Sequence, residues 1–130
     1  GCVVGLHYHL HQADYWYVPF GTVRVVLHDL RQGSPTEGVT EETDLVGTKH
    51  RGIYIPPGVA HGFATLTDAT ITYMVDSYYN PSDELGVAWN DPEIAADWGV
   101  DNPTLSERDQ SNPLRNAIPE VDQPRYGLRN

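Results

Sequence analysis

Short apolar runs, several of them bounded by glycine or proline, constrain this chain more than any other feature of its sequence. Residues 15–20 and 22–28 flank Gly21, and the run at 51–55 ends in Pro56-Pro57-Gly58. Runs of this length fit β-strands, whereas the helices of a bundle need longer runs with a 3.6-residue period. Short strands at even spacing predict a β-sandwich or a β-barrel. Further strands are expected at 3–10, at 60–66, at 69–75 and, as a weak edge strand, at 39–47.

The length of 130 residues fits one domain with one core. We expect the barrel to occupy residues 1–100. The strand pattern fades beyond Tyr79, and residues 92–98 are compatible with one short helical turn. Residues 101–130 are rich in Pro, Asn, Ser and Arg, which predicts an irregular, short-helical extension packed on the same domain.

Charge and composition exclude several classes of partner. The formal net charge is -10, from 18 acidic and 8 basic residues, so nucleic acid and anionic membranes are not expected to bind. No apolar run approaches the roughly 20 residues that cross a bilayer. Cys2 is the only cysteine, which makes the cytoplasm the simplest location. The chain starts at Gly1, and we expect it to be a fragment or a processed piece of a longer protein.

Three histidines and one acid form a spaced pattern. His7 and His9 lie two apart on an expected strand and therefore share a face, Asp14 follows, and His61 comes just after a Pro/Gly turn. The order His-x-His, acid, Gly21, then Pro-x-Gly-x-x-His resembles the two signatures of the cupins. That resemblance implies a jelly-roll barrel in which the four side chains converge on Fe(II), Mn(II), Ni(II) or Zn(II). The alternative is a polar, hydrogen-bonded barrel mouth that holds no metal.

Further motifs resemble a family of sugar-nucleotide epimerases over nearly the whole chain. These motifs are Gly5-Leu6-His7-Tyr8, Asp29-Leu30-Arg31 with Ser34-Pro35-Thr36, Ile55 to Phe63, Tyr73 with Tyr79-Asn80-Pro81, Trp89-Asn90-Asp91-Pro92, Trp98, and Leu105 to Asp109. Their order is similar to that of the dTDP-4-dehydrorhamnose 3,5-epimerases. Several short motifs in one order are far more specific than any one of them.

The resemblance implies an isomerase that works by proton transfer next to a ketone. The 4-keto group of the sugar acidifies the neighbouring C–H bonds, a base removes one proton, and an acid returns a proton from the opposite face. By resemblance His7 is the base, Asp109 orients its imidazole, and Tyr73 is the acid. The implied substrate-binding residues are His61 near the keto oxygen, Tyr79 on the pocket wall, and Arg51. This reading needs no cofactor.

Two positions depart from the family pattern. Asp14 stands where the family usually has a lysine that stabilises the enolate oxygen, and Val4 stands where an arginine commonly helps to hold the diphosphate. A carboxylate at position 14 would repel a developing enolate. A divalent metal on His7, His9, Asp14 and His61 could replace that lysine as a Lewis acid.

The sequence therefore allows three functions. The first is an epimerase of a nucleotide-linked 4-keto-6-deoxyhexose, the second is a metal-dependent cupin enzyme acting on another small oxygenated substrate, and the third is a non-catalytic sugar-binding cupin. The expected partners are a nucleotide-sugar substrate and, by resemblance, a second copy of the chain in a homodimer. Tyr15-Trp16-Tyr17 could contribute to that interface or face the core.

Overall fold

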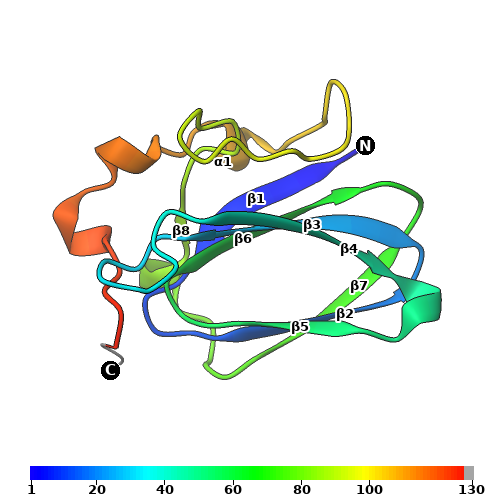
Figure 1. Ribbon diagram of the computed structural model, residues 1–130, viewed down its shortest axis with the longest axis horizontal. Coiled ribbons are helices and arrows are strands. Elements are labelled where there is room, and N and C mark those ends of the chain that lie inside the picture. Colours follow the sequence, from blue (N-terminus) through cyan, green and yellow to red (C-terminus); the bar gives the residue numbers. More distant parts are fainter. Residues whose placement is uncertain (128–130) are drawn as a thin grey trace.

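The structure is a computed structural model, and it describes residues 1–127. Eight strands form two antiparallel sheets (Figure 1), which confirms the all-β class. The five-stranded sheet has the order β4-β3-β6-β1-β8, and the three-stranded sheet has the order β5-β2-β7. The strands are β1 (Val3–Tyr8), β2 (Asp14–Phe20), β3 (Thr22–Asp29), β4 (Thr40–Val46), β5 (Gly52–Ile55), β6 (Val59–Thr65), β7 (Thr70–Val75) and β8 (Leu85–Gly86).

The two sheets face each other and enclose a barrel interior (Figure 1). β2 lies between β5 and β7, pairing Trp16 with Ile53 on one side and with Tyr73 on the other. β3 lies between β4 and β6 in continuous register. β4 forms an edge of the larger sheet, as the weak apolar pattern of residues 39–47 predicted.

Two apolar clusters hold the fold together. One fills the barrel interior between the sheets and contains Trp16, Val18, Val23, Val25, Leu45, Ile55 and Val59. The other packs the outer side of the larger sheet under the chain beyond β8, and it contains Leu6, Tyr8, Val26, Ile94, Trp98 and Ile118 among others. The inner cluster leaves part of the interior to polar side chains, and that part becomes the candidate site.

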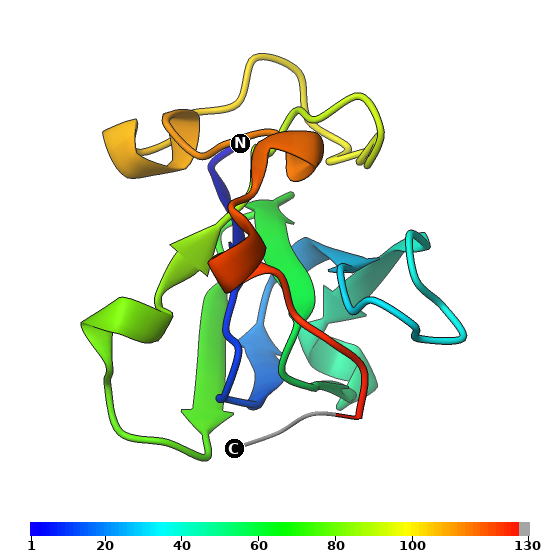
Figure 2. The same ribbon diagram turned by 90° about the vertical axis from the view of Figure 1, so that its left-hand side faces the viewer.

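The chain beyond β8 runs along the outer side of the five-stranded sheet (Figures 1 and 2). Its short helices are α1 (Glu107–Gln110), η3 (Arg115–Ala117) and η4 (Glu120–Asp122), while η1 (Gly47–Lys49) and η2 (Pro81–Asp83) lie earlier. Cys2 forms a parallel bridge with Thr104, and Ile118 is buried in the outer cluster. None of the helices described is long and apolar enough to cross a membrane.

The helical turn expected at residues 92–98 is shorter than predicted. Residues 92–94 form a single turn, which the Asp91 carboxylate caps by accepting the backbone N–H groups of Glu93 and Ile94 at 2.7 and 3.3 Å. The N–H of Ala95 closes the turn by donating to the carbonyl of Asp91 at 2.9 Å. Ala95 then takes a left-handed φ of 52°, which ends any helical path. The helix of this region forms later, at Glu107–Gln110.

An irregularity in β1 orients the first histidine. The pairing register of β1 with β6 shifts between Val4 and His7. Gly5 and Gly62 approach so closely there that a Cβ on Gly5 would lie 2.8 Å from the Gly62 Cα. Two glycines are therefore needed at this crossing. The shift brings Val4 and His7 to the same interior cleft, while Leu6 and Tyr8 are buried in the outer cluster.

Candidate active site

A cleft of about 640 Å³ opens between the two sheets. Strands β1, β2, β6 and β7 supply most of its wall, and the segment from Tyr79 to Glu84 closes one side. The lining residues are Val4, His7, His9, Gln12, Asp14, Trp16, His61, Phe63, Ile71, Tyr73, Val75, Tyr79, Glu84 and Arg108. Most of the residues that the sequence singled out thus share one cavity.

His7 and Asp109 form the shortest charged contact in the cleft. The His7 Nε2 atom lies 2.6 Å from Asp109 Oδ1, and the Asp109 side chain is 4% exposed against 22% for His7. Because an ionised carboxylate can only accept, Nε2 carries the proton of a neutral ring and Nδ1 keeps its lone pair. Among residues 1–127, no hydrogen-bond partner of Nδ1 is found. His7 therefore presents a basic nitrogen on a ring whose other nitrogen is held.

A four-residue helix places Asp109. Ser106 caps α1, and its Oγ accepts the backbone N–H of Asp109 at 3.1 Å. The second carboxylate oxygen of Asp109 accepts the backbone N–H of Gly5 at 3.1 Å. The carboxylate is thus fixed both to its own helix and to β1, two residues before His7. The sequence predicted an irregular, short-helical extension here without locating this helix, although Ser-x-x-Asp is a recognised helix-start pattern.

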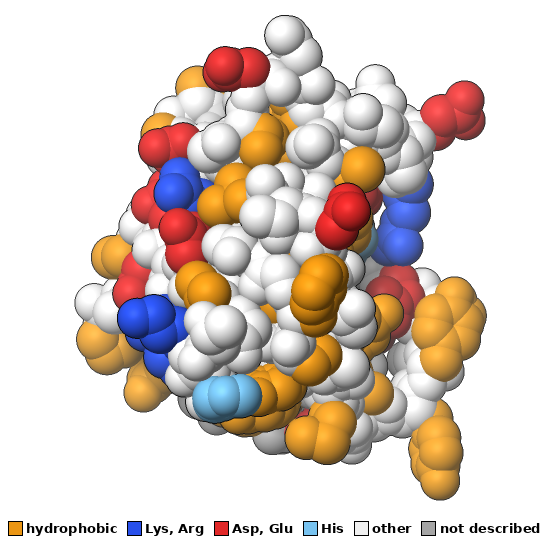
Figure 3. Space-filling view, turned by 90° about the vertical axis from the view of Figure 1, so that its right-hand side faces the viewer, with side chains coloured by type: hydrophobic (Ala, Val, Ile, Leu, Met, Phe, Trp, Pro, Cys, Tyr) orange, Lys and Arg blue, Asp and Glu red, His pale blue; other side chains and the backbone are white. Residues whose placement is uncertain are grey.

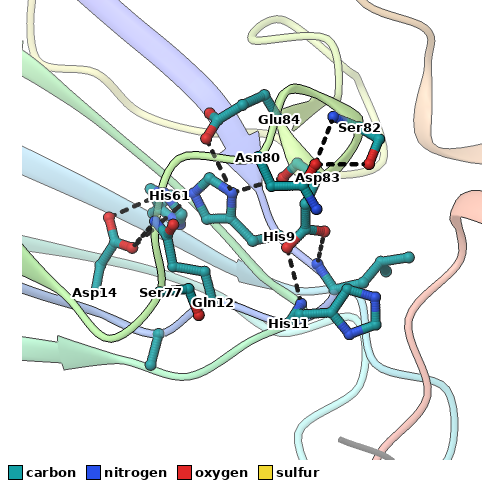
Figure 4. Close-up of polar contacts among 12 residues, drawn as sticks. His9, His11, Gln12, Asp14, His61, Ser77, Asn80, Ser82, Asp83 and Glu84 are labelled. Atoms are coloured by element: carbon teal, nitrogen blue, oxygen red, sulfur yellow. Dashed lines mark hydrogen bonds and ion pairs between the residues drawn. The ribbon is translucent and has the colours of Figure 1, made fainter. Parts of the chain in front are cut away.

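His9, Asp14 and His61 form a second, fully buried group (Figure 4). His9 Nε2 lies 3.9 Å from Asp14 Oδ1, and His61 Nε2 lies 3.8 Å from Asp14 Oδ2. One ligand atom from each of the three falls within 4.8 Å of the others. His7, the fourth residue of the expected metal set, lies outside this group and binds Asp109 instead. The structure thus brings three of the four together.

The backbone fixes both histidine rings of this group. His9 Nδ1 lies 2.7 Å from the carbonyl oxygen of Asp83, and His61 Nδ1 lies 3.0 Å from that of Val59. η2 is tied to the same strand end, because the Asp83 carboxylate accepts the N–H groups of Leu10 and His11. Burial lowers the pKa of His61 to about 4, so this ring is neutral at pH 7.

The two tyrosines line the open part of the cleft. Tyr73 on β7 is 63% exposed and Tyr79 is 77% exposed. Arg51 is placed elsewhere: its guanidinium donates to Thr43 Oγ1 and to the Asp44 carbonyl, and it is not among the cleft-lining residues.

Four cleft residues were not found from the sequence. Gln12 and Trp16 donate to the two oxygens of Asp14 at 2.8 and 3.2 Å, and their positions two residues before and two residues after Asp14 were the available signal. Glu84 reaches His9 Nδ1 at 3.9 Å. Arg108, beside Asp109 in sequence, is the only Lys or Arg among the described residues that line the cleft.

Comparison with known proteins identifies the family. Residues 1–116 match the family model described as dTDP-4-dehydrorhamnose 3,5-epimerase. The chain belongs to the dTDP-4-dehydrorhamnose 3,5-epimerase family. The resemblance seen in the sequence motifs is thereby confirmed.

Curated members of the dTDP-4-dehydrorhamnose 3,5-epimerase family match most of the chain. A dTDP-4-dehydrorhamnose 3-epimerase of Streptomyces niveus is 42% identical over 85% of this chain and 55% of its own length. A dTDP-4-dehydrorhamnose 3,5-epimerase of Pseudomonas aeruginosa is 40% identical over 85% of this chain and 63% of its own length. The chain thus spans less than two thirds of these relatives.

Solved structures of the family share the fold. NovW, a 4-keto-6-deoxy sugar epimerase from the novobiocin gene cluster of Streptomyces spheroides, has a TM-score of 0.91 at 40% identity and covers 97% of this chain and 66% of its own. RmlC from Legionella pneumophila, solved in complex with dTDP-4-keto-L-rhamnose, has a TM-score of 0.91 at 36% identity, with 98% and 70% covered. The expected cupin-type barrel is confirmed.

Proposed function

We propose that this protein is an epimerase of a nucleotide-linked 4-keto-6-deoxyhexose. The observation that carries the proposal is the His7–Asp109 contact of 2.6 Å in a cleft large enough for a sugar ring. Support comes from relatives named for epimerisation of dTDP-4-dehydrorhamnose and from a related structure solved with dTDP-4-keto-L-rhamnose. A nucleotide sugar is therefore the proposed partner in the cleft.

His7 acts in this mechanism as the general base. Its Nδ1 lone pair removes a proton from a carbon next to the ketone, and the electron pair of the C–H bond moves toward the keto oxygen as an enolate. The Nε2–H bond to Asp109 stabilises the imidazolium that forms and keeps the ring from rotating. The Asp109 carboxylate is itself held by Gly5 N–H, so the pair is oriented before substrate arrives.

Tyr73 serves as the acid on the other sheet. It extends from β7 while His7 extends from β1, so the two line the cleft from opposite sheets. A proton returned from the tyrosine side reaches the face of the enolate opposite to the base, which inverts the carbon. Tyr79 and His61 are proposed to contact the sugar, whereas the position of Arg51 outside the cleft favours no such contact.

Solvent hydrogen exchange tests the activity. The protein is incubated with dTDP-4-keto-6-deoxyglucose in D₂O, and deuterium at the two carbons flanking the ketone is followed by NMR. We expect incorporation that falls about 100-fold or more in His7→Gln. His50→Gln is the matched control, because His50 is exposed at the C-terminal end of η1 and does not line the cleft.

The three possible outcomes of this experiment point to different functions. Deuterium incorporation by the wild type no faster than in buffer would exclude the epimerase and leave a sugar-binding protein. Deuterium at one carbon only would identify a mono-epimerase, and deuterium at both would identify a 3,5-epimerase.

A homodimer is the proposed assembly. The outer face of the three-stranded sheet carries a row of exposed apolar side chains in register, with Tyr15 paired to Tyr54 on β5 and to Met74 on β7. Figure 3 shows hydrophobic side chains gathered toward the lower part of one face, the side of this sheet. Light scattering should give about twice the chain mass of 14.5 kDa, reduced to one chain by Met74→Glu but not by Val121→Glu. The cytoplasmic location stays a prediction.

A further inference from the structure

Two buried imidazoles and one buried carboxylate meet on one wall of the cleft, apart from the His7–Asp109 pair. His9, Asp14 and His61 are 5%, 6% and 4% exposed. Buried charges and buried imidazoles are stable only when each polar atom has a partner. We propose that these three residues bind one divalent transition-metal ion.

The tautomers of both histidines suit metal binding. A backbone carbonyl oxygen can only accept, so the Nδ1 atoms of His9 and His61 must be the donors to Asp83 and Val59. Each neutral ring therefore carries an unprotonated Nε2, and both Nε2 atoms face Asp14 (Figure 4). Among residues 1–127, neither Nε2 atom has a hydrogen-bond donor. Histidine ligands in metal sites are commonly oriented in this way, by a backbone carbonyl on the other ring nitrogen.

Hydrogen bonds from neighbouring side chains fix the Asp14 carboxylate as well. Gln12 Nε2 donates to Asp14 Oδ1 at 2.8 Å, and Trp16 Nε1 donates to Asp14 Oδ2 at 3.2 Å. The Trp16 ring also packs edge-on against His61, with centroids 5.2 Å apart. Each oxygen thus has one hydrogen bond from a residue two positions away in the chain, and further lone pairs for an ion. This outer layer fixes Asp14 without neutralising it.

The spacing is close to that of a bound ion. Metal bonds of about 2.1 Å at tetrahedral angles place ligand atoms about 3.4 Å apart. The Nε2-to-oxygen distances are 3.9 and 3.8 Å, so small rotations of the side chains suffice. Two imidazole nitrogens and one carboxylate oxygen suit Zn(II), Fe(II), Co(II) or Mn(II). With three ligands from the chain, at least one coordination position faces the cleft.

The alternative is a water molecule among the three side chains. A water can donate to both Nε2 atoms or to one of them and to Asp14, which would satisfy the same polar atoms. Water and metal differ in charge: an ion balances the carboxylate itself, whereas a water molecule leaves that balance to a protonated imidazole of the group. The cleft offers Arg108 as its only other fixed cation among the described lining residues. The convergence of one ligand atom from each of the three residues within 4.8 Å favours the ion.

A role for the ion rests on the proposed epimerase function. An ion on this wall would place positive charge beside the cleft that holds His7, where the enolate oxygen would otherwise meet the Asp14 carboxylate. Binding of the metal does not depend on that role. His7 remains free to act as the base, because it lies outside the group of ligands.

Titration of the metal-free protein with Co²⁺ tests the site directly. The full chain is purified without a histidine tag, stripped with a chelator, and titrated while visible absorption is recorded. We expect saturation at one ion per chain, with the intense bands of a four- or five-coordinate N/O site. His61→Gln and Asp14→Asn should lower affinity at least about 100-fold, whereas His50→Gln, which removes an exposed imidazole, should leave the titration unchanged.

Thermal unfolding of the wild type gives a second measurement that needs no variant. An ion that binds only the folded state raises Tm with its concentration. Absence of one-to-one Co²⁺ binding and of any Tm increase with Zn²⁺ or Co²⁺ would overturn the proposal. Equal binding by the wild type and Asp14→Asn would do the same. Deuterium exchange into the keto sugar, measured on the metal-free protein, tests the proposed epimerase function independently of metal binding.

Discussion

His7 and His9 are two residues apart and line one cleft, but they expose opposite ring nitrogens. His7 donates from Nε2 to the Asp109 carboxylate and keeps Nδ1 free, whereas His9 donates from Nδ1 to a backbone carbonyl and keeps Nε2 free. The sequence placed both on one face and allowed His7 as base or as ligand. Hydrogen-bond partners that are 102 and 74 residues away separate these roles. Such partners are set by tertiary packing, which strand periodicity does not contain.

Replacement of Tyr73 should separate proton removal from inversion. Tyr73→Phe keeps the ring on β7 but removes the hydroxyl that returns the proton. We expect epimerised product to form about 100-fold more slowly, while His7 still exchanges deuterium at a rate within about tenfold of the wild type. Product stereochemistry and deuterium content are measured in the same NMR sample.

Tyr78 offers a matched control for that experiment. Its side chain is 99% exposed and does not line the cleft, so Tyr78→Phe should leave both rates unchanged. An equal loss of exchange and product in Tyr73→Phe would show that Tyr73 acts in proton removal or in binding, and not as the acid.

At the scale of elements, the positions of the strands were predictable, whereas short helices were expected beyond residue 100 without their positions. Seven expected strands are present with ends within about two residues, because most had an apolar run bounded by Gly, Pro or polar turn residues. The turn expected at 92–98 ends after residue 94 because Ala95 has a left-handed φ of 52°, and α1 was not located because four residues carry no periodicity. The base and its carboxylate came from family motifs, while Gln12, Trp16 and Glu84 emerged only from the packing.

The loop between β3 and β4 depends on one buried carboxylate. Burial acts to raise the pKa of Asp29, but hydrogen bonds from Arg31, Ser34 and Thr36 outweigh it and hold the pKa below its usual value. Asp29→Asn replaces one acceptor oxygen by a donor that faces those donors. We expect the free energy of unfolding at pH 7 to fall by about 3 kcal/mol, measured by urea denaturation.

Asp68→Asn is the control for this change, because Asp68 is exposed in the β6–β7 turn. It should shift the free energy of unfolding by no more than about 0.5 kcal/mol. A similar small shift for Asp29→Asn would show that the loop does not need the charge.

At the scale of the whole molecule, one buried histidine joins the barrel to the chain that covers it. His28 on β3 is 1% exposed. Its Nδ1 donates to Thr40 Oγ1 at 2.7 Å, because the Thr40 hydroxyl itself donates to the carbonyl of Ile94 at 2.8 Å. Nε2 has no hydrogen-bond partner among residues 1–127. Protonation would therefore place a charge where nothing described accepts its hydrogen.

Acid should destabilise the protein through this residue. Burial, with the nearby positive charge of Arg115, lowers the pKa of His28 from 6.5 to about 4, while Asp29 and Asp91 oppose the shift more weakly. Between these values the unfolded chain binds a proton that the folded chain does not. Stability from His28 is thus complete above pH 6.5 and is lost as pH falls toward 4, by at most about 3 kcal/mol.

A comparison of His28→Asn with the wild type isolates the effect of this proton on stability. His28→Asn keeps a donor near Thr40 Oγ1 but cannot titrate, so its free energy of unfolding should vary less between pH 6.5 and 4 than that of the wild type, by up to about 1.4 kcal/mol per pH unit. His61 titrates in the same range and contributes equally to both proteins, so its effect cancels in the comparison. His50→Asn, which changes an exposed ring, should retain the full wild-type dependence. Parallel curves for His28→Asn and the wild type would mean that the folded protein accepts the proton on His28 as readily as the unfolded chain does, and that the contact between barrel and covering chain adapts to the charge.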